Sequence, residues 1–258
     1  MFGAILGDII GSIYEFKNIR QTDFPIVSRE AMFTDDTVMT VATAYALLNK
    51  ADYAETYKSF GRRYPGRGYG GRFKEWLEKD TMDAYNSFGN GSAMRVSPVA
   101  YACKSLEAVL IEAKKSAEAT HNHLEGIKGA QSVASAIYLA RTGVVKSDIK
   151  SFITDNFSYN LSFRLNEIRH NYEFDETCQG SVPQAIVAFL ESDNYEDAVR
   201  KAVSIGGDSD TIACIAGSIA EAYYGSLPVD LVRYAESKLD YYMLDIIRRF
   251  RTKFMLEG

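Results

Sequence analysis

The 258-residue sequence is poor in the residues that cross-link or anchor proteins. Its three cysteines, Cys103, Cys178 and Cys214, are far apart and odd in number, which excludes a disulfide framework and a paired-cysteine zinc site. The longest stretch without a charged residue, 177–190, has 14 residues and contains Pro183. Because a membrane span needs ~18 apolar residues, we expect no membrane-spanning segment.

Positive charge is not in excess either. The chain has 29 Lys and Arg against 34 Asp and Glu, a net charge of −5, so the composition gives no reason to expect stable nucleic-acid binding. The apolar N-terminal segment has no basic leader and soon reaches Asp8, so we interpret it as mature structure rather than a secretory signal. Together with the unpaired cysteines, these features predict a cytoplasmic protein.

The sequence is rich in apolar residues that recur at intervals of three and four, the pattern of amphipathic helices. Strand-like alternation is weak throughout. After a first helix through Ile5, Ile9 and Ile13, we expect helices at residues 37–48, 106–119, 124–141, 182–190, 195–203, 212–224 and 231–254. Residues 64–73 should form a loop, and residues 144–175 short helices and a covering segment.

The chain shows no Ser-, Pro- or Gly-rich linker and no internal repeat, and 47% of its residues are hydrophobic. We therefore expect an all-α fold, a compact orthogonal multi-helix bundle that forms a single domain over residues 1–258. Gly3, Gly7 and Gly11 lie four residues apart and so share one helix face. Side chains this small let two helix backbones approach closely, which predicts tight packing at that face.

Two short acidic segments stand immediately before apolar helices: Thr34-Asp35-Asp36-Thr37 and Asp208-Ser209-Asp210-Thr211. Thr and Asp are favourable helix N-caps, and one acidic group suffices for that role. Two carboxylates this close repel each other unless a cation neutralises them. Two interpretations stay open: separate ordinary caps, or one shared cation site.

If the two caps face each other, they can hold two ions ~3.5–4 Å apart with a water between them. The segments offer carboxylate and hydroxyl oxygens without Cys or His, which favours Mg²⁺ or Mn²⁺ over zinc. Asp8 and Glu15 are seven residues apart and fall on nearly the same face of the first helix. Exposed carboxylates would explain them equally well, but either could be a further ligand.

Seven motifs in order along the chain carry a resemblance to a known family. They are Gly7-Asp8, Glu15-Phe16, Phe33-Thr-Asp-Asp-Thr37, Gly89-Asn-Gly-Ser-Ala-Met-Arg95, Thr120-His-Asn-His123 with Gly126-Ile-Lys-Gly-Ala130, Cys178-Gln-Gly-Ser-Val-Pro183 and Gly206-Gly-Asp-Ser-Asp-Thr211. The sequence resembles the ADP-ribosylglycohydrolase family, the group of the dinitrogenase-reductase-activating glycohydrolase. The resemblance implies an all-α fold with a binuclear magnesium or manganese centre at the bottom of an ADP-ribose cleft.

The resemblance also assigns roles to residues of this chain. It implies that two Mg²⁺ or Mn²⁺ ions are held by six residues of the two acidic segments: Thr34, Asp35, Asp36, Asp208, Asp210 and Thr211. Glu15 matches an acidic residue near the metals and the scissile bond, and Glu15 or Asp36 is the expected catalytic proton acceptor. No metal-ligand position of the family is substituted, which weighs against a non-catalytic relative.

The segment Gly89 to Arg95 suits an anion, because glycines leave backbone amides free and Arg95 adds a planar charged donor. Without the family, the segment is equally a tight turn before a helix, and it fits neither a Walker A nor a Rossmann loop. The resemblance implies contacts to the diphosphate and ribose from Gly91, Ser92, Met94 and Arg95.

Three further features receive specific expectations. The resemblance matches His123 to a position that faces the cleft, where it would position substrate, and we expect a structural role for His121. Ser181 and Gln184 have the spacing of a capping box, so we expect Ser181 to cap a helix. The arginine- and glycine-rich residues 62–72 should form a mobile surface loop, and the resemblance makes it a lid or rim of the cleft.

The resulting hypothesis is a metal-dependent hydrolase of the glycosidic bond between ADP-ribose and an acceptor. Its partner would be an ADP-ribosylated protein, nucleic acid or small molecule. Two alternatives stay open: a metal-dependent nucleotide phosphohydrolase, which would use the same oxygen ligands on a pyrophosphate, and a non-catalytic ADP-ribose-binding protein. The sequence selects neither the acceptor nor an oligomeric state.

Overall fold

A computed structural model describes residues 1–256, and every regular element in this range is helical, as the sequence predicts. The elements are α1 (Phe2–Gly11), α2 (Asp35–Asn49), α3 (Tyr53–Arg63), α4 (Gly71–Glu78), α5 (Gly91–Met94), α6 (Ser97–Ala102), α7 (Leu106–Glu118), α8 (Leu124–Arg141), α9 (Lys146–Phe157), α10 (Leu165–Ile168), α11 (Cys178–Leu190), α12 (Tyr195–Val203), α13 (Ser209–Tyr224), α14 (Val229–Glu236), α15 (Tyr241–Arg251) and the π-helical turn η1 (Thr252–Leu256). The described residues contain one isolated bridge, between Gly89 and Thr177, and no helix long and apolar enough to cross a bilayer.

Several helices depart from the prediction. Helix α1 ends at Gly11, so the expectations that the first helix reaches Ile13 and that Asp8 and Glu15 share one of its faces are wrong. Helices α3, α4 and α6 were not expected. Local capping explains two further differences. The helix expected at residues 231–254 is interrupted, because Asp240 accepts a hydrogen bond from the Met243 amide and starts α15 as a separate helix. The helix expected from residue 182 begins earlier, at Cys178, with Thr177 as its cap. The expected capping role of Ser181 is therefore wrong.

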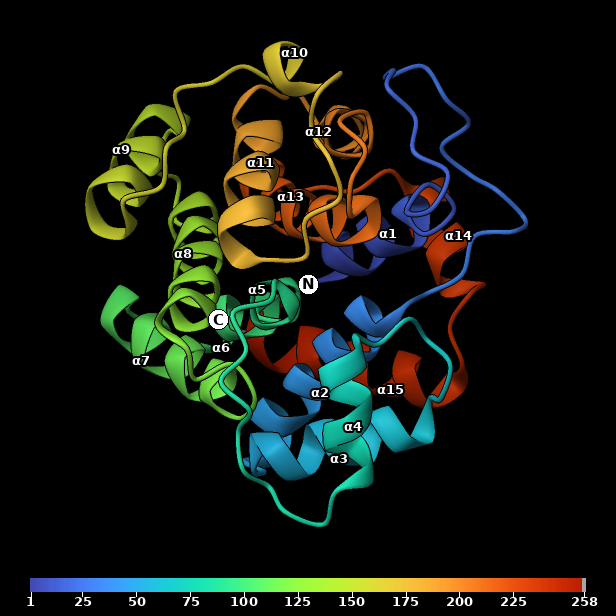
Figure 1. Cartoon of the computed structure of the whole chain (residues 1–258), viewed down its shortest axis with the longest axis vertical. Coiled ribbons are helices and arrows are strands. Elements are labelled where there is room, and N and C mark those ends of the chain that lie inside the picture. Colours follow the sequence, from blue (N-terminus) through green and yellow to red (C-terminus); the bar gives the residue numbers. More distant parts are fainter. Residues whose placement is uncertain (257–258) are drawn as a thin grey trace.

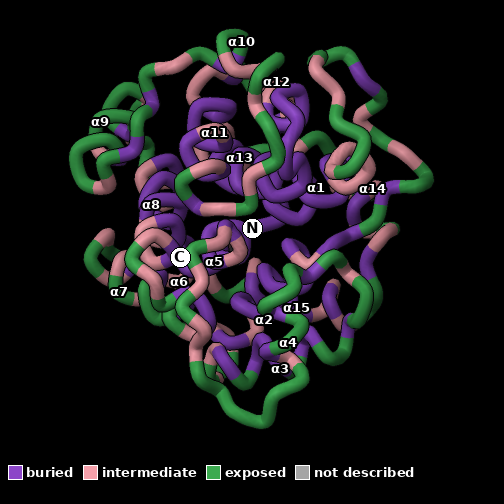
Figure 2. Tube along the Cα trace, viewed as in Figure 1, coloured by how far each residue is buried: buried purple, intermediate pink, exposed green. Residues whose placement is uncertain are grey.

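The three spaced glycines of α1 face α13, as their spacing predicts. A Cβ atom on Gly3 would lie within 3 Å of the Gly217 carbonyl oxygen, one on Gly7 would overlap the Ala213 backbone, and one on Gly11 the Asp210 backbone. The helices run antiparallel, since the start of α1 lies against the later part of α13. Figure 1 shows the pair near the centre of the molecule, and Figure 2 shows that both helices are buried.

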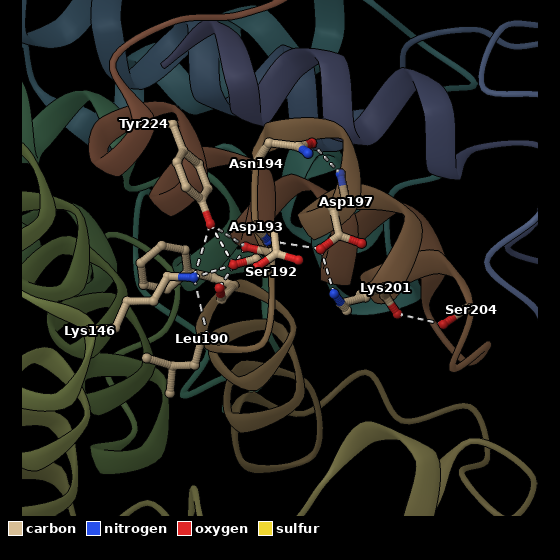
Figure 3. A network of polar contacts seen from close by, with 10 residues as sticks. Lys146, Leu190, Ser192, Asp193, Asn194, Asp197, Lys201, Ser204 and Tyr224 are labelled. Atoms are coloured by element: carbon tan, nitrogen blue, oxygen red, sulfur yellow. Dashed lines mark hydrogen bonds and ion pairs between the residues drawn. The ribbon is translucent and has the colours of Figure 1, made fainter.

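A lysine joins the start of α9 to the ends of two core helices. The Lys146 ammonium donates to the Leu190 carbonyl at the end of α11, to the Ser192 carbonyl, and to the Tyr224 hydroxyl at the end of α13 (Figure 3). A cation at helix C-termini satisfies carbonyl groups that have no partner within the helix. Lys146 therefore fixes α9 to the outside of the bundle.

Candidate metal centre and substrate cleft

The buried carboxylate of Asp8 connects α1 to the start of α2. It accepts hydrogen bonds from the backbone amides of Thr34 and Thr37 at 3.0 and 3.1 Å, and from the hydroxyl groups of the same two residues. Burial raises the pKa of Asp8 to about 6, although the hydrogen bonds from Thr37 and Thr34 act in the opposite direction. Asp8 does not line the cleft, so it supports the first acidic segment from behind.

The second acidic segment meets the first at the start of α13. Asp208 occupies the N-cap position of α13 but makes no side-chain capping bond; one of its oxygens instead accepts from the Asn90 amide at 2.7 Å. The Thr211 hydroxyl donates to Asp36 Oδ1 at 3.2 Å. The structure thus brings together two segments that lie more than 170 residues apart in the sequence.

The carboxylates at this junction have the arrangement of a cation site. Glu15, Asp208 and Asp210 each offer an oxygen, and these three oxygens lie within 4.8 Å of one another. Among the described residues, the buried oxygens Asp36 Oδ2 and Asp210 Oδ1 have no hydrogen-bond partner. A buried charged oxygen is costly without a partner. The all-oxygen donor set suits Mg²⁺ or Mn²⁺ and could hold either.

Burial and mutual repulsion perturb the pKa of every carboxylate in the junction. Burial, followed by the charges of Asp210 and Asp8, raises the pKa of Asp35 and Asp36 well above its ordinary range and that of Glu15 to about 8. Burial and the neighbouring Asp208 do the same to the pKa of Asp210. A bound cation would oppose these shifts, because it favours the ionised form of each carboxylate.

A cleft of about 370 Å³ opens above the carboxylates. Five of the six predicted metal-binding residues line it, with Glu15: Asp35, Asp36, Asp208, Asp210 and Thr211. Thr34 does not line the cleft, because its hydroxyl donates to Asp8 and accepts from the Asp36 amide as the cap of α2. The loop between α3 and α4 lines the cleft through Gly68 and Gly70, and the first turn of α4 lines it through Gly71 and Arg72, so this segment lies at the expected rim. The loop is shorter than the expected residues 62–72 and 64–73, because α3 continues to Arg63 and α4 begins at Gly71.

The glycine-rich segment forms a wall of the cleft, with differences from the expected contacts. Gly91, Met94 and Arg95 line the cleft. Ser92 does not, because its hydroxyl donates to the Gly126 carbonyl at 2.7 Å behind the wall. Arg95 uses Nη2 to bond the Ser116 carbonyl and the Thr120 hydroxyl, and Nε is its buried nitrogen without a partner among the described residues.

The two histidines exchange the positions that we expected. His123 caps α8, where its Nδ1 accepts from the Glu125 amide, and it does not line the cleft, so the expectation that it faces the cleft is wrong. His121 lines the cleft, and its Nδ1 lies 2.7 Å from the Thr120 hydroxyl. Because that hydroxyl accepts from Arg95, it can donate its own proton to Nδ1 and leave the ring proton on Nε2.

The charge state of His121 follows from its surroundings. Burial, with the charges of Arg95 and Arg72, holds the pKa of His121 well below its ordinary value, so the ring is neutral. The Nε2 atom lies against Gly91, where an added Cβ would be 3.1 Å away. A neutral ring with Nε2–H would offer one hydrogen-bond donor at this wall of the cleft.

Several cleft residues were not assigned to the site from the sequence, and two of them, His121 and Asn90, make defined polar contacts there. The Asn90 amide nitrogen donates to both Asp208 and Ser181, and the Ser181 hydroxyl donates to the Asp175 carbonyl. This chain of hydrogen bonds orients Asp208 toward the cleft. Its one sequence signal is a polar residue between two glycines, Gly89 and Gly91.

Comparisons with known proteins agree on one family. Residues 1–254 match the ADP-ribosylglycohydrolase family. ADP-ribosylhydrolase ARH3 of Gallus gallus is 31% identical over 86% of this chain and 83% of its own length. ADP-ribosylhydrolase ARH3 of Homo sapiens is 30% identical over 86% of this chain and 84% of its own length. ADP-ribosylarginine hydrolase Tri1 of Pseudomonas putida is 25% identical over 87% of this chain and 69% of its own length.

A solved structure shares the fold. It is described as an ADP-ribosylglycohydrolase-related protein complex, superposes with a TM-score of 0.74 and is 21% identical, with 98% of this chain and 96% of that chain covered. At this identity the likeness concerns the fold alone.

Proposed function

Because the chain belongs to the ADP-ribosylglycohydrolase family, we propose that it uses divalent metal ions to hydrolyse the glycosidic bond between ADP-ribose and an acceptor. It is an enzyme that hydrolyses glycosyl bonds, in line with the hydrolases that it resembles. The observation that carries the metal requirement is the junction of carboxylates with two buried, unpartnered oxygens at the cleft floor, within residues 1–256.

Glu15, Asp35, Asp36, Asp208, Asp210 and Thr211 would hold two Mg²⁺ or Mn²⁺ ions. When bound, the ions supply positive charge that orients the ribose hydroxyls and lowers the pKa of a water. Glu15 is the better candidate to accept the proton of that water, because it is half-buried at the cleft surface. Asp36 is buried and has one oxygen held by Thr211.

The glycine-rich wall suits the diphosphate of ADP-ribose. It combines the glycine-rich backbone around Gly91, the neutral ring of His121 and the guanidinium group of Arg95, whose buried Nε has no partner among the described residues. Donors without acceptors favour phosphate oxygens. The acceptor, a protein, nucleic acid or small molecule, would lie near the rim. The three free cysteines suit a reducing compartment, and we assign the protein to the cytoplasm on that basis.

The test is a panel of ADP-ribosylated substrates with different linkages, assayed with Mg²⁺, Mn²⁺ or EDTA. Release of free ADP-ribose is expected with metal and not with EDTA. Release of AMP would instead identify a phosphohydrolase. Tight ADP-ribose binding without turnover of any linkage would identify a non-catalytic binding protein. Full turnover after complete metal removal would refute the proposed metal dependence.

Matched variants test the cleft itself. Asp36→Asn and Asp210→Asn should lose both turnover and bound metal, because each removes a carboxylate that faces the proposed ions. Asp245→Asn is the control, since Asp245 pairs with Arg249 at the surface of α15. Normal metal content in Asp36→Asn and Asp210→Asn would show that the ions bind outside this cleft.

A further inference from the structure

Glu15 belongs to the carboxylate cluster but lies outside the helices. Helix α1 ends at Gly11, and residues 12–17 form turns and bends. The Asp208 and Asp210 oxygens that approach Glu15 come from the start of α13. Because the backbone that carries Glu15 has no helical hydrogen bonds to fix it, other contacts must hold it in position.

The side chain of Asn18 supplies those contacts. Its Nδ2 donates to the carbonyls of Tyr14 at 2.7 Å, Glu15 at 2.9 Å and Gly207 at 3.0 Å. Its Oδ1 accepts from the Gly207 amide at 2.8 Å. We call this carboxamide with its four backbone partners the Asn18 clamp.

The clamp admits only one orientation of the carboxamide. Nδ2 has two hydrogens for three carbonyl acceptors, so one hydrogen is shared. The reversed carboxamide would place Oδ1 against three carbonyl oxygens and the NH₂ group against the Gly207 amide. The position of Gly207 requires glycine, because its φ is +71° and an added Cβ would overlap the Tyr172 ring.

The position of the clamp gives it a direct effect on the carboxylate cluster. It joins the backbone of Glu15 to the residue immediately before Asp208, so it bridges the two chain segments that supply the cluster. The neighbouring Arg20 independently bonds the Ile205 and Tyr172 carbonyls. The two loops should therefore stay docked when the clamp is removed.

We propose that Asn18 is a positioning residue that sets the spacing between Glu15 and the Asp208 and Asp210 carboxylates, and through it the affinity of the cleft for divalent ions. This inference rests on the proposed function, because it requires the carboxylates to hold metal. Residues that support metal ligands commonly change metal affinity when they are replaced.

The test measures Mn²⁺ binding by calorimetry without substrate. Asn18→Ala should bind Mn²⁺ roughly 10- to 100-fold more weakly, and excess Mn²⁺ should restore part of the turnover. ADP-ribose binding to the metal-free protein should stay unchanged, since the glycine-rich wall is untouched. Asn156→Ala is the control, because Asn156 makes a single side-chain bond, to the Phe152 carbonyl in α9.

A second variant separates position from charge. Asn18→Asp has the same shape but directs an oxygen at the three carbonyls, so it should also weaken Mn²⁺ binding despite its added negative charge. Unchanged affinity in Asn18→Ala, or tighter binding in Asn18→Asp, would overturn the inference while the proposed function stands. A wild-type protein that binds neither Mn²⁺ nor Mg²⁺ would overturn both.

Discussion

Removal of the divalent ions should make the folded chain lose stability as the pH rises from 4 to 8. Burial raises the pKa of Asp208 to about 6 in the folded protein, against 3.8 for an ordinary aspartate, although its hydrogen bonds with Asp210 and Asn90 lower it. The folded state therefore binds this proton more tightly than the unfolded chain does. The contribution of protonated Asp208 to the free energy of unfolding is complete below pH 3.8 and is lost as the pH rises through 6.

The size of the loss follows from the same difference. A pKa of about 6 instead of 3.8 corresponds to ~3 kcal/mol for Asp208 alone. Glu15 has a pKa of about 8, so the decline should continue to that pH; because Glu15 is half-exposed, solvent screening keeps its contribution small. Domains are typically stable by only about 5–15 kcal/mol, so the loss should be easy to measure.

The assay is urea unfolding followed by circular dichroism between pH 4 and 8, with EDTA or with Mn²⁺. The EDTA series should show the decline, and Mn²⁺ should reverse it progressively, because metal binding requires deprotonated carboxylates. A concentration of 100 times the dissociation constant should add ~2.7 kcal/mol. An Asp36→Asn control should flatten the EDTA series, since it removes one of the repelling charges.

The reasoning would be refuted by an EDTA series in which stability is constant or increases over this pH range. It would also fail if Mn²⁺ stabilised the protein equally at pH 4 and pH 8. Either result would mean that the carboxylates of the cleft do not carry the protons that their burial implies.

Three further predictions use single substitutions. Asn90→Ala removes the hydrogen bond to Asp208 and should weaken Mn²⁺ binding roughly 10- to 100-fold by calorimetry; unchanged affinity would contradict the orienting role. Gly7→Ala forces a methyl group into the backbone of the neighbouring helix and should cost about 1–3 kcal/mol or more in urea unfolding; a neutral effect would argue against the close packing. His123→Ala should cost ~1 kcal/mol of helix-cap stability and retain turnover, whereas His121→Ala should raise KM; the opposite pattern would restore the original assignment.

The longer helices and the acidic junction were predictable because their signals are local, whereas α3, α4 and α6 were not predicted. The spacing of apolar residues locates α8 and α12. The segments before α2 and α13 contain more carboxylates than helix capping needs, and this surplus predicts a cation site. The interruption between α14 and α15 was missed because the apolar pattern continues across it, while one cap at Asp240 decides the geometry.

His121 lines the cleft and His123 caps a helix, the reverse of the prediction, because the sequence pattern does not say which histidine faces the cleft. Alternation in an extended segment says that the two rings point apart, but not which of them faces the cleft. That choice depends on Arg95, which reaches from another part of the chain to the Thr120 hydroxyl beside His121. The Asn18 clamp could not be predicted either, because it depends on a contact with Gly207, which lies 189 residues away in the sequence.

Helix α1 sets the distance between the two acidic segments by two opposite means. The face of α1 that packs on α13 carries glycines, so the backbone at Gly11 lies directly against the Asp210 backbone. On the other, Asp8 accepts hydrogen bonds from the first turn of α2, where a negative charge is favoured by the helix dipole. Four hydrogen bonds and the dipole stabilise this carboxylate without a metal ion, which explains how Asp8 can be buried as a support. Asp36 and Asp210, each with one buried oxygen that has no partner among the described residues, line the cleft instead.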